Sequence, residues 1–228
     1  MSVPPLKLVA FDMDGVLLDY RSSWTWVHDH FGIDNRATVD AWASGEIDEM
    51  EFMRRDICAW IRKHPRVSRA DIGRILDGIP VRNGIRRTVD ALHAAGIKVV
   101  IVSGGIDIIA AKIALDNGFD GYAANGLACD ESGCLTGEGL LNVEIQNKRT
   151  ALERFMEDYQ VGQDEVASIG DSFIDIAMFN VSRIGIAFNP TDEEVVKSAD
   201  VVIRSDDLTS VLETLIGPGR VARPAGRT

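Results

Sequence analysis

Two aspartates directly follow an apolar run near the N-terminus, a position and residue type suited to chemistry. The run LKLVAF, residues 6–11, leads into the sequence DMDGV. Such a run, rich in Val and Leu, is typical of a buried strand in a parallel sheet. Because side chains alternate along a strand, we expect Asp12 and Asp14 on one side and Met13 on the other. Open α/β sheets bind their ligands at the carboxyl ends of strands, so this pair is a candidate site.

A second apolar run, IKVVIV at residues 97–102, ends in Ser103 and Gly104 and a further glycine before a predicted helix. A hydroxyl and free backbone N–H groups at a helix N-terminus can hold a phosphate oxygen. Further along, Lys148 begins a predicted helix, and its compact positive charge could neutralise a phosphate. The adjacent Arg149 is a competing candidate. These residues suggest a phosphate-binding function.

The fourth motif, GDSFID at residues 170–175, again follows an apolar run. Asp171 lies at the predicted strand end, and Asp175 lies one helical turn later. If the strands are parallel neighbours, these aspartates join Asp12 and Asp14 in one pocket, where like charges need neutralisation. A carboxylate-rich site without His or Cys suits Mg²⁺. We therefore expect a magnesium site beside the phosphate-binding residues.

Strands that alternate with helices predict an α/β fold with a doubly wound parallel sheet. Residues 18–80 interrupt this alternation with helical patterns and hold all four tryptophans, which we expect to form the core of a small all-helical cap domain. The predicted α/β core is discontinuous, comprising residues 1–17 and 81–216. Residues 122–144 predict a hairpin, and residues 217–228 predict a disordered tail.

The composition excludes several classes of function. A net charge of −11 argues against a general nucleic-acid binder, which needs a basic surface, but a local phosphate site stays compatible with it. Three cysteines without a CxxC spacing predict neither a disulfide framework nor a zinc site. We expect a cytoplasmic protein, because the N-terminus lacks signal-peptide features and no apolar run approaches the roughly 20 residues that cross a bilayer.

The order DxDGV, apolar strand with SGG, lysine and GDxxxD resembles the haloacid dehalogenase superfamily of phosphatases. The resemblance extends from residue 6 to about residue 216. The helical insert, the SGG form and the hairpin before the lysine are most similar to the phosphoserine phosphatase branch. This resemblance implies a Rossmann-like core with an inserted helical cap, and it implies an Mg²⁺-dependent phosphomonoesterase.

The resemblance also implies catalytic roles. Asp12 would be the nucleophile that forms an aspartyl-phosphate intermediate. Asp14 would protonate the leaving oxygen and then activate water. Ser103, the Gly104 amide and Lys148 would hold the phosphoryl oxygens.

The implied Mg²⁺ ligands are Asp12, the backbone carbonyl of Asp14, and Asp171. Asp175 would support these ligands from behind.

Two departures from the phosphoserine phosphatase pattern concern the substrate. The glutamate that receives the substrate amine in that branch corresponds here to Arg21, and an arginine cannot receive an ammonium group. The arginine that holds the substrate carboxylate falls near Arg54, Arg55 or Asp56, and we take Arg55 as the candidate. Ile174 also replaces the usual asparagine of the last motif. We therefore expect a small phosphomonoester other than phosphoserine, with an anionic body that Arg21 could bind.

Two alternatives remain open from the sequence. A phosphotransferase or phosphomutase uses the same DxDGV motif, although its cap differs. A non-catalytic phosphate-binding regulatory protein could keep the fold, although the complete set of motif residues argues against it. The sequence predicts no nucleic-acid or membrane partner, and it leaves the oligomeric state open between monomer and homodimer.

Overall fold

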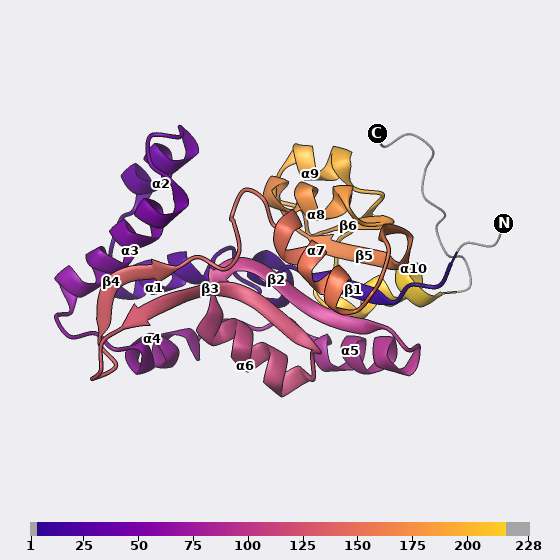
Figure 1. The fold of residues 1–228 in the computed structure, drawn as a ribbon, viewed down its shortest axis with the longest axis horizontal. Helices are drawn as coiled ribbons and strands as arrows, with labels where there is room; N and C mark the ends of the chain where they lie inside the picture. Colours follow the sequence, from indigo (N-terminus) through magenta and orange to yellow (C-terminus); the bar gives the residue numbers. More distant parts are fainter. Residues whose placement is uncertain (1–3, 218–228) are drawn as a thin grey trace.

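A seven-stranded sheet forms the centre of the molecule in the computed structural model, which describes residues 4–217 (Figure 1). The strand order is β4-β3-β2-β1-β5-β6-β7, and all neighbouring pairs are parallel except β3 and β4. The strands are β1 Leu8–Phe11, β2 Lys98–Ile106, β3 Gly121–Cys129, β4 Leu135–Leu140, β5 Val166–Gly170, β6 Ile184–Phe188 and β7 Val201–Ile203.

The α-helices divide between an inserted group and the two faces of the sheet. The inserted helices are α1 Ser23–Phe31, α2 Arg36–Ala43, α3 Glu49–Lys63 and α4 Arg69–Leu76. The helices of the core are α5 Ile85–Ala94, α6 Asp107–Asn117, α7 Arg149–Asp158, α8 Ile176–Asn180, α9 Glu193–Ser198 and α10 Leu212–Ile216.

The central strand β1 is buried on both faces. Val9 and Phe11 belong to the large apolar cluster that includes residues of α5 and α6. Leu8 and Ala10 point the other way, into a cluster with α7. A strand covered by helices on both faces is the arrangement of a doubly wound sheet, so the predicted fold class is confirmed.

The inserted helices form the predicted cap, at the end of the molecule away from β6 and β7 (Figure 1). The chain leaves and re-enters the core where Leu18 pairs with Val81. The proposed domain boundaries stay a prediction, and residues 218–228 of the predicted tail lie outside the described residues.

The predicted hairpin is present as β3 and β4, and it contacts the cap as well as the core. Strand β4 packs against α3. The backbone N–H of Leu135 donates to the Val67 carbonyl at 2.9 Å, and Ser68 forms a bridge with Cys134. The hairpin therefore joins the end of the sheet to the base of α4.

The tryptophans do more than fill the cap. Trp60 is fully buried, stacks on Trp24 with ring centroids 5.4 Å apart, and donates from Nε1 to His28 Nδ1 at 3.2 Å. Trp26 donates to the Ile75 carbonyl at 2.9 Å, which joins α1 to α4. Trp24 and Trp42, however, line a cavity between cap and core. Trp24 and Trp60 are buried in the core as predicted, whereas Trp26 and Trp42 are only partly buried.

No helix among the described residues is long and apolar enough to cross a membrane.

The start of α4 provides a test of local stability. Ser68 accepts a hydrogen bond from Asp71 N at 3.2 Å, and Asp71 accepts one from Ser68 N at 2.8 Å, which together form a reciprocal capping box. We expect Ser68→Ala to lower the free energy of unfolding by about 1 kcal/mol in urea titrations. Ser68→Thr keeps the acceptor and serves as the control. Equal losses in both variants would contradict the capping role.

Candidate active site

Strand β1 lies between β2 and β5, and its carboxyl end is the point where the chain direction across the sheet changes. Phe11 lies opposite Ile101 of β2 and Ile169 of β5. The backbone N–H of Asp12 then donates to the Ile169 carbonyl at 2.9 Å, which holds Asp12 beside the end of β5. Ligands of open α/β sheets bind at such a switch point, so the geometry agrees with the predicted location.

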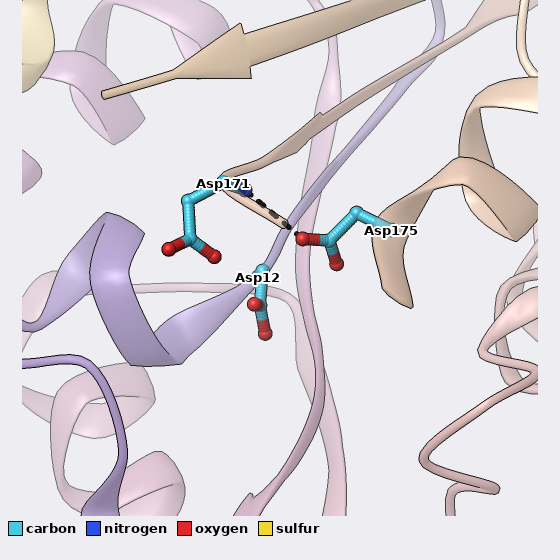
Figure 2. A group of neighbouring side chains, drawn as sticks. All are labelled: Asp12, Asp171 and Asp175. Carbon is cyan, nitrogen blue, oxygen red and sulfur yellow. Dashed lines mark hydrogen bonds between the residues drawn. The ribbon is translucent and has the colours of Figure 1, made fainter. Parts of the chain in front are cut away.

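Three buried carboxylates meet at this edge (Figure 2). Asp12 follows β1, Asp171 follows β5, and Asp175 lies at the start of α8. One oxygen from each lies within 4.8 Å of the others, and the three residues are no more than 5% exposed. The sequence motifs thus converge as expected.

Lys148 lies in the middle of this negative charge. Its Nζ is 2.8 Å from Asp12 Oδ1 and 2.7 Å from Asp175 Oδ1, and its side chain is 4% exposed. Burial disfavours the ammonium form, but the charges of Asp12 and Asp175 outweigh it, so the pKa of Lys148 is raised. Lys148 is therefore a fixed positive charge beside Asp12.

One lysine does not balance the carboxylates. Burial, followed by repulsion from Asp175, raises the pKa of Asp12 to about 7 against the opposing charge of Lys148. Burial and then the charges of Asp12 and Asp175 raise the pKa of Asp171 to about 8. Carboxyl groups this difficult to ionise require further positive charge to be anionic near neutral pH.

The donor set fits a hard divalent cation. Both carboxylate oxygens of Asp175 already have partners. Its Oδ1 is paired with Lys148, and its Oδ2 accepts hydrogen bonds from Asp171 N at 2.9 Å and Ser172 N at 3.1 Å. The Asp171 carboxylate, in contrast, accepts no hydrogen bond from another described residue, although it is buried. Oxygen ligands of this kind suit Mg²⁺, with Asp12 and Asp171 available and Asp175 holding the loop behind them.

Asp14 also faces the cavity but has a separate environment. Its carboxylate accepts two hydrogen bonds of 3.0 Å, from the backbone N–H and the hydroxyl of Ser23 at the start of α1. Burial raises the pKa of Asp14 to about 6, although these bonds oppose the shift. A carboxyl group near this value can both hold and release a proton at neutral pH.

The SGG segment forms the opposite wall of the site. Gly105 N donates to Ser103 Oγ at 3.1 Å, and a Cβ on Gly105 would lie 2.7 Å from Asp14 Oδ2. The Gly104 carbonyl accepts from Trp24 Nε1 at 3.1 Å and from Asn125 Nδ2 at 3.2 Å. These bonds hold the Gly104 carbonyl between α1 and β3, which fixes the SGG segment at the wall of the cavity.

The turn after Asp14 packs closely against Asp171 and is held by hydrogen bonds from Arg82. Gly15 has a φ of +77°, and a Cβ there would lie 2.3 Å from Asp171 Oδ2. Arg82 donates to the carbonyls of Val16 at 2.9 Å and Gly15 at 3.1 Å. The turn therefore requires glycine for both its conformation and its space.

The sequence reasoning missed Ser23, Arg82 and Asn125. Asn125 is fully buried, and its side-chain oxygen accepts from the backbone N–H groups of Asn142 and Val143 at 2.9 Å. An asparagine in the middle of a β-prone run was a usable signal, because that residue type is depleted in strands. The sequence carries no such signal for Ser23 and Arg82, because their hydrogen-bond partners lie far away in the sequence or on the backbone.

A cavity of about 340 Å³ contains these groups and extends beneath the cap. Its lining includes all the predicted catalytic, phosphate-binding and metal residues except Asp175, which lies behind, together with Arg21 and Ile174. Arg55 is not brought to this cavity. It lines a separate surface hollow, and its Nε donates to Glu51 at 2.8 Å, because α3 directs this face away from the core site.

A larger cavity of about 590 Å³ lies wholly in the residues of the cap segment and contains none of the predicted site residues. We assign the active site to the smaller cavity because the buried carboxylates and Lys148 lie there.

The raised pKa values make the stability of the metal-free protein depend on pH. The folded protein keeps protons on Asp12 and Asp171 that the unfolded chain releases at its ordinary carboxyl pKa. This stabilisation is complete below the unfolded pKa and is lost as pH rises through about 7 to 8. We expect the free energy of unfolding to fall from about pH 5 to about pH 8 in metal-free urea titrations. Surface acids such as Glu51, whose pKa is lowered to about 2, titrate outside this window.

Mg²⁺ should raise the melting temperature more at about pH 8 than at about pH 6, because it competes with these protons. Asp171→Asn is the control and should flatten both dependences. The charge assignment would be contradicted by a free energy of unfolding that does not change with pH in the metal-free protein, or by an equal Mg²⁺-induced rise in melting temperature at the two pH values.

Comparison with known proteins supports a family assignment. The chain is 28% identical to the phosphoserine phosphatase of Idiomarina loihiensis over 91% of this chain and 93% of that protein. It is 36% identical to the phosphoserine phosphatase of Lactococcus lactis over 64% of this chain and 65% of that protein. A solved phosphoserine phosphatase carrying an analogue of the phospho-aspartyl intermediate shares the fold, with a TM-score of 0.77 and 24% identity over 92% of this chain and 99% of that one. The family model of haloacid dehalogenase-like hydrolases matches residues 6–182. The chain therefore belongs to the haloacid dehalogenase-like hydrolases, in their phosphoserine phosphatase-like branch.

Proposed function

We propose that this phosphatase hydrolyses a small phosphomonoester with Mg²⁺ through an aspartyl-phosphate on Asp12, and that its substrate is not phosphoserine. The observation that carries the proposal is the distance of 2.8 Å between Lys148 Nζ and Asp12 Oδ1, in the cavity that Ser103 and Gly104 also line. This arrangement supports the assignment of Asp12 as nucleophile, because a fixed positive charge that could hold the phosphoryl oxygens lies beside its carboxylate.

In the first step an oxygen of Asp12 forms a bond to phosphorus while the ester P–O bond breaks. Asp14, with a pKa of about 6, gives its proton to the leaving oxygen. In the second step Asp14 takes a proton from water, which attacks the same phosphorus and releases phosphate from Asp12. Ser103, the Gly104 amide and Lys148 hold the phosphoryl oxygens throughout.

Asp12, Asp171 and the Asp14 backbone carbonyl would hold Mg²⁺, with Asp175 supporting them. When bound, the ion supplies the positive charge that lets a phosphate dianion approach this group of carboxylates.

The cap argues for a substrate other than phosphoserine. Residues 18–80 contribute no carboxylate to the lining of the cavity, so an ammonium group would lack a partner there. Arg21 lines the same cavity, is exposed, and makes no hydrogen bond or ion pair with another described residue. An anionic group on the substrate body would complement it.

We expect Asp12→Asn to reduce phosphate release from small phosphomonoesters to the uncatalysed background, because the amide is a poor nucleophile. A colorimetric phosphate assay with Mg²⁺, over a panel of several dozen phosphorylated metabolites, measures this. Asp175→Asn, which alters a supporting group, should keep measurable activity. Full activity in Asp12→Asn would refute the nucleophile assignment, and transfer of phosphate to a sugar rather than to water would indicate a mutase.

A charge reversal at Arg21 tests the substrate prediction. We expect Arg21→Glu to raise kcat/KM for phosphoserine by about tenfold or more, equivalent to about 1.4 kcal/mol, because it supplies a partner for the ammonium group. Arg21→Gln serves as the neutral control. The proposal would be contradicted if the wild-type protein preferred phosphoserine to other phosphomonoesters and both Arg21 variants kept that preference.

A further inference from the structure

We propose that the substrate carries a flat ring that lies against the aromatic cap wall, which we define as Trp42 and Phe52. This inference rests on the proposed phosphatase function and extends it to the chemical class of the substrate. Both residues line the cavity that contains Asp12 and Lys148.

The aromatic cap wall is a prearranged surface. Trp42 of α2 and Phe52 of α3 stack with ring centroids 5.2 Å apart and an interplanar angle of 26°. Phe52 is buried, whereas Trp42 is part-exposed, so Trp42 retains surface that a ligand could cover. Aromatic rings prefer offset-stacked or edge-to-face contacts with other rings, which an extended apolar chain cannot reproduce.

Apolar groups continue this wall across the cavity. Val39 of α2 lines the same cavity and is 37% exposed, so it also retains apolar surface that a ligand could cover. Ile145 and Ile174 line it from the core side. A ring inserted between these groups would bury apolar surface on both of its faces.

The few polar cap groups at the cavity suit such a ligand better than a flexible zwitterion. Thr25 and Asn35 can form hydrogen bonds to ring substituents, and Arg21 can bind an acidic substituent. A small acyclic zwitterion would find no carboxylate of the cap in this lining to receive its ammonium group, and Arg21 would repel that group. A rigid ring also loses less conformational freedom on binding than a flexible chain does.

Four synthetic esters with alkyl leaving groups separate the contributions of ring and charge: benzyl phosphate, 4-carboxybenzyl phosphate, propyl phosphate and 3-carboxypropyl phosphate. All four esters release primary alcohols of similar acidity, so differences in kcat/KM report contacts with the body of the substrate rather than differences in leaving-group chemistry. We expect the wild-type enzyme with Mg²⁺ to prefer benzyl over propyl phosphate by at least about tenfold, equivalent to about 1.4 kcal/mol. The carboxylate should give a further gain that Arg21→Gln removes.

Variants of the aromatic cap wall locate the preference. Trp42→Leu should reduce the benzyl-to-propyl ratio to about threefold or less, whereas Trp42→Phe should keep most of it. Trp26→Leu is the matched control, because Trp26 lies in the same cap but lines the other cavity. The ratio of two substrates on one protein sample does not depend on the folded fraction, so a destabilised variant still gives a valid result.

The outcomes distinguish this inference from the proposed function. Phosphate release from all four esters with equal efficiency, or a ring preference that Trp42→Leu leaves unchanged, would overturn the ring inference alone. Release from none of these esters, nor from any member of a wider phosphomonoester panel, would overturn the phosphatase proposal and the ring inference with it.

Discussion

The excess of negative charge at the carboxyl end of β1 is the constraint on which the rest of the site depends. Asp12, Asp171 and Asp175 are buried within 4.8 Å of one another, and the Lys148 ammonium group lies between two of them. Such a cluster is unfavourable unless cations neutralise it. The same excess of negative charge that raises the carboxyl pKa values would favour a bound cation, and such a cation would let the site accept a phosphate dianion.

The cap takes part in forming the catalytic site and does more than cover it. The first two residues of α1 both contact the candidate site. Ser23 donates hydrogen bonds to the Asp14 carboxylate, and Trp24 donates one to the Gly104 carbonyl. Ser23 Oγ also accepts from Ile106 N at 3.0 Å, which ties α1 to the end of β2. Helix α1, which directly follows Arg21 and Ser22, is therefore fixed to the groups that would move the proton and hold the phosphate. This connection gives a physical route by which the cap could couple substrate selection to catalysis.

Much of the fold and the placement of the core site could be predicted from the sequence, because both depend on local patterns. Apolar runs ending in polar residues located Asp12, Ser103 and Asp171, and parallel strands must bring such ends to one edge. Groups that act through distant partners could not be found this way, as Ser23 and Arg82 show. The structure does not bring Arg55 to the cavity, because the three neighbouring candidates Arg54, Arg55 and Asp56 all line the separate surface hollow of α3.

The proposed chemistry requires a covalent phosphoryl intermediate on Asp12, and this intermediate can be trapped and mapped. Enzyme mixed with Mg²⁺ and a turned-over ester labelled with radioactive phosphorus can be quenched in acid within the first turnover, then digested and mapped. We expect label on the peptide that contains Asp12, released by hydroxylamine as expected for an acyl phosphate, and absent from Asp12→Asn. Rapid turnover of the ester with no label on the protein, or label on another residue, would contradict this expectation.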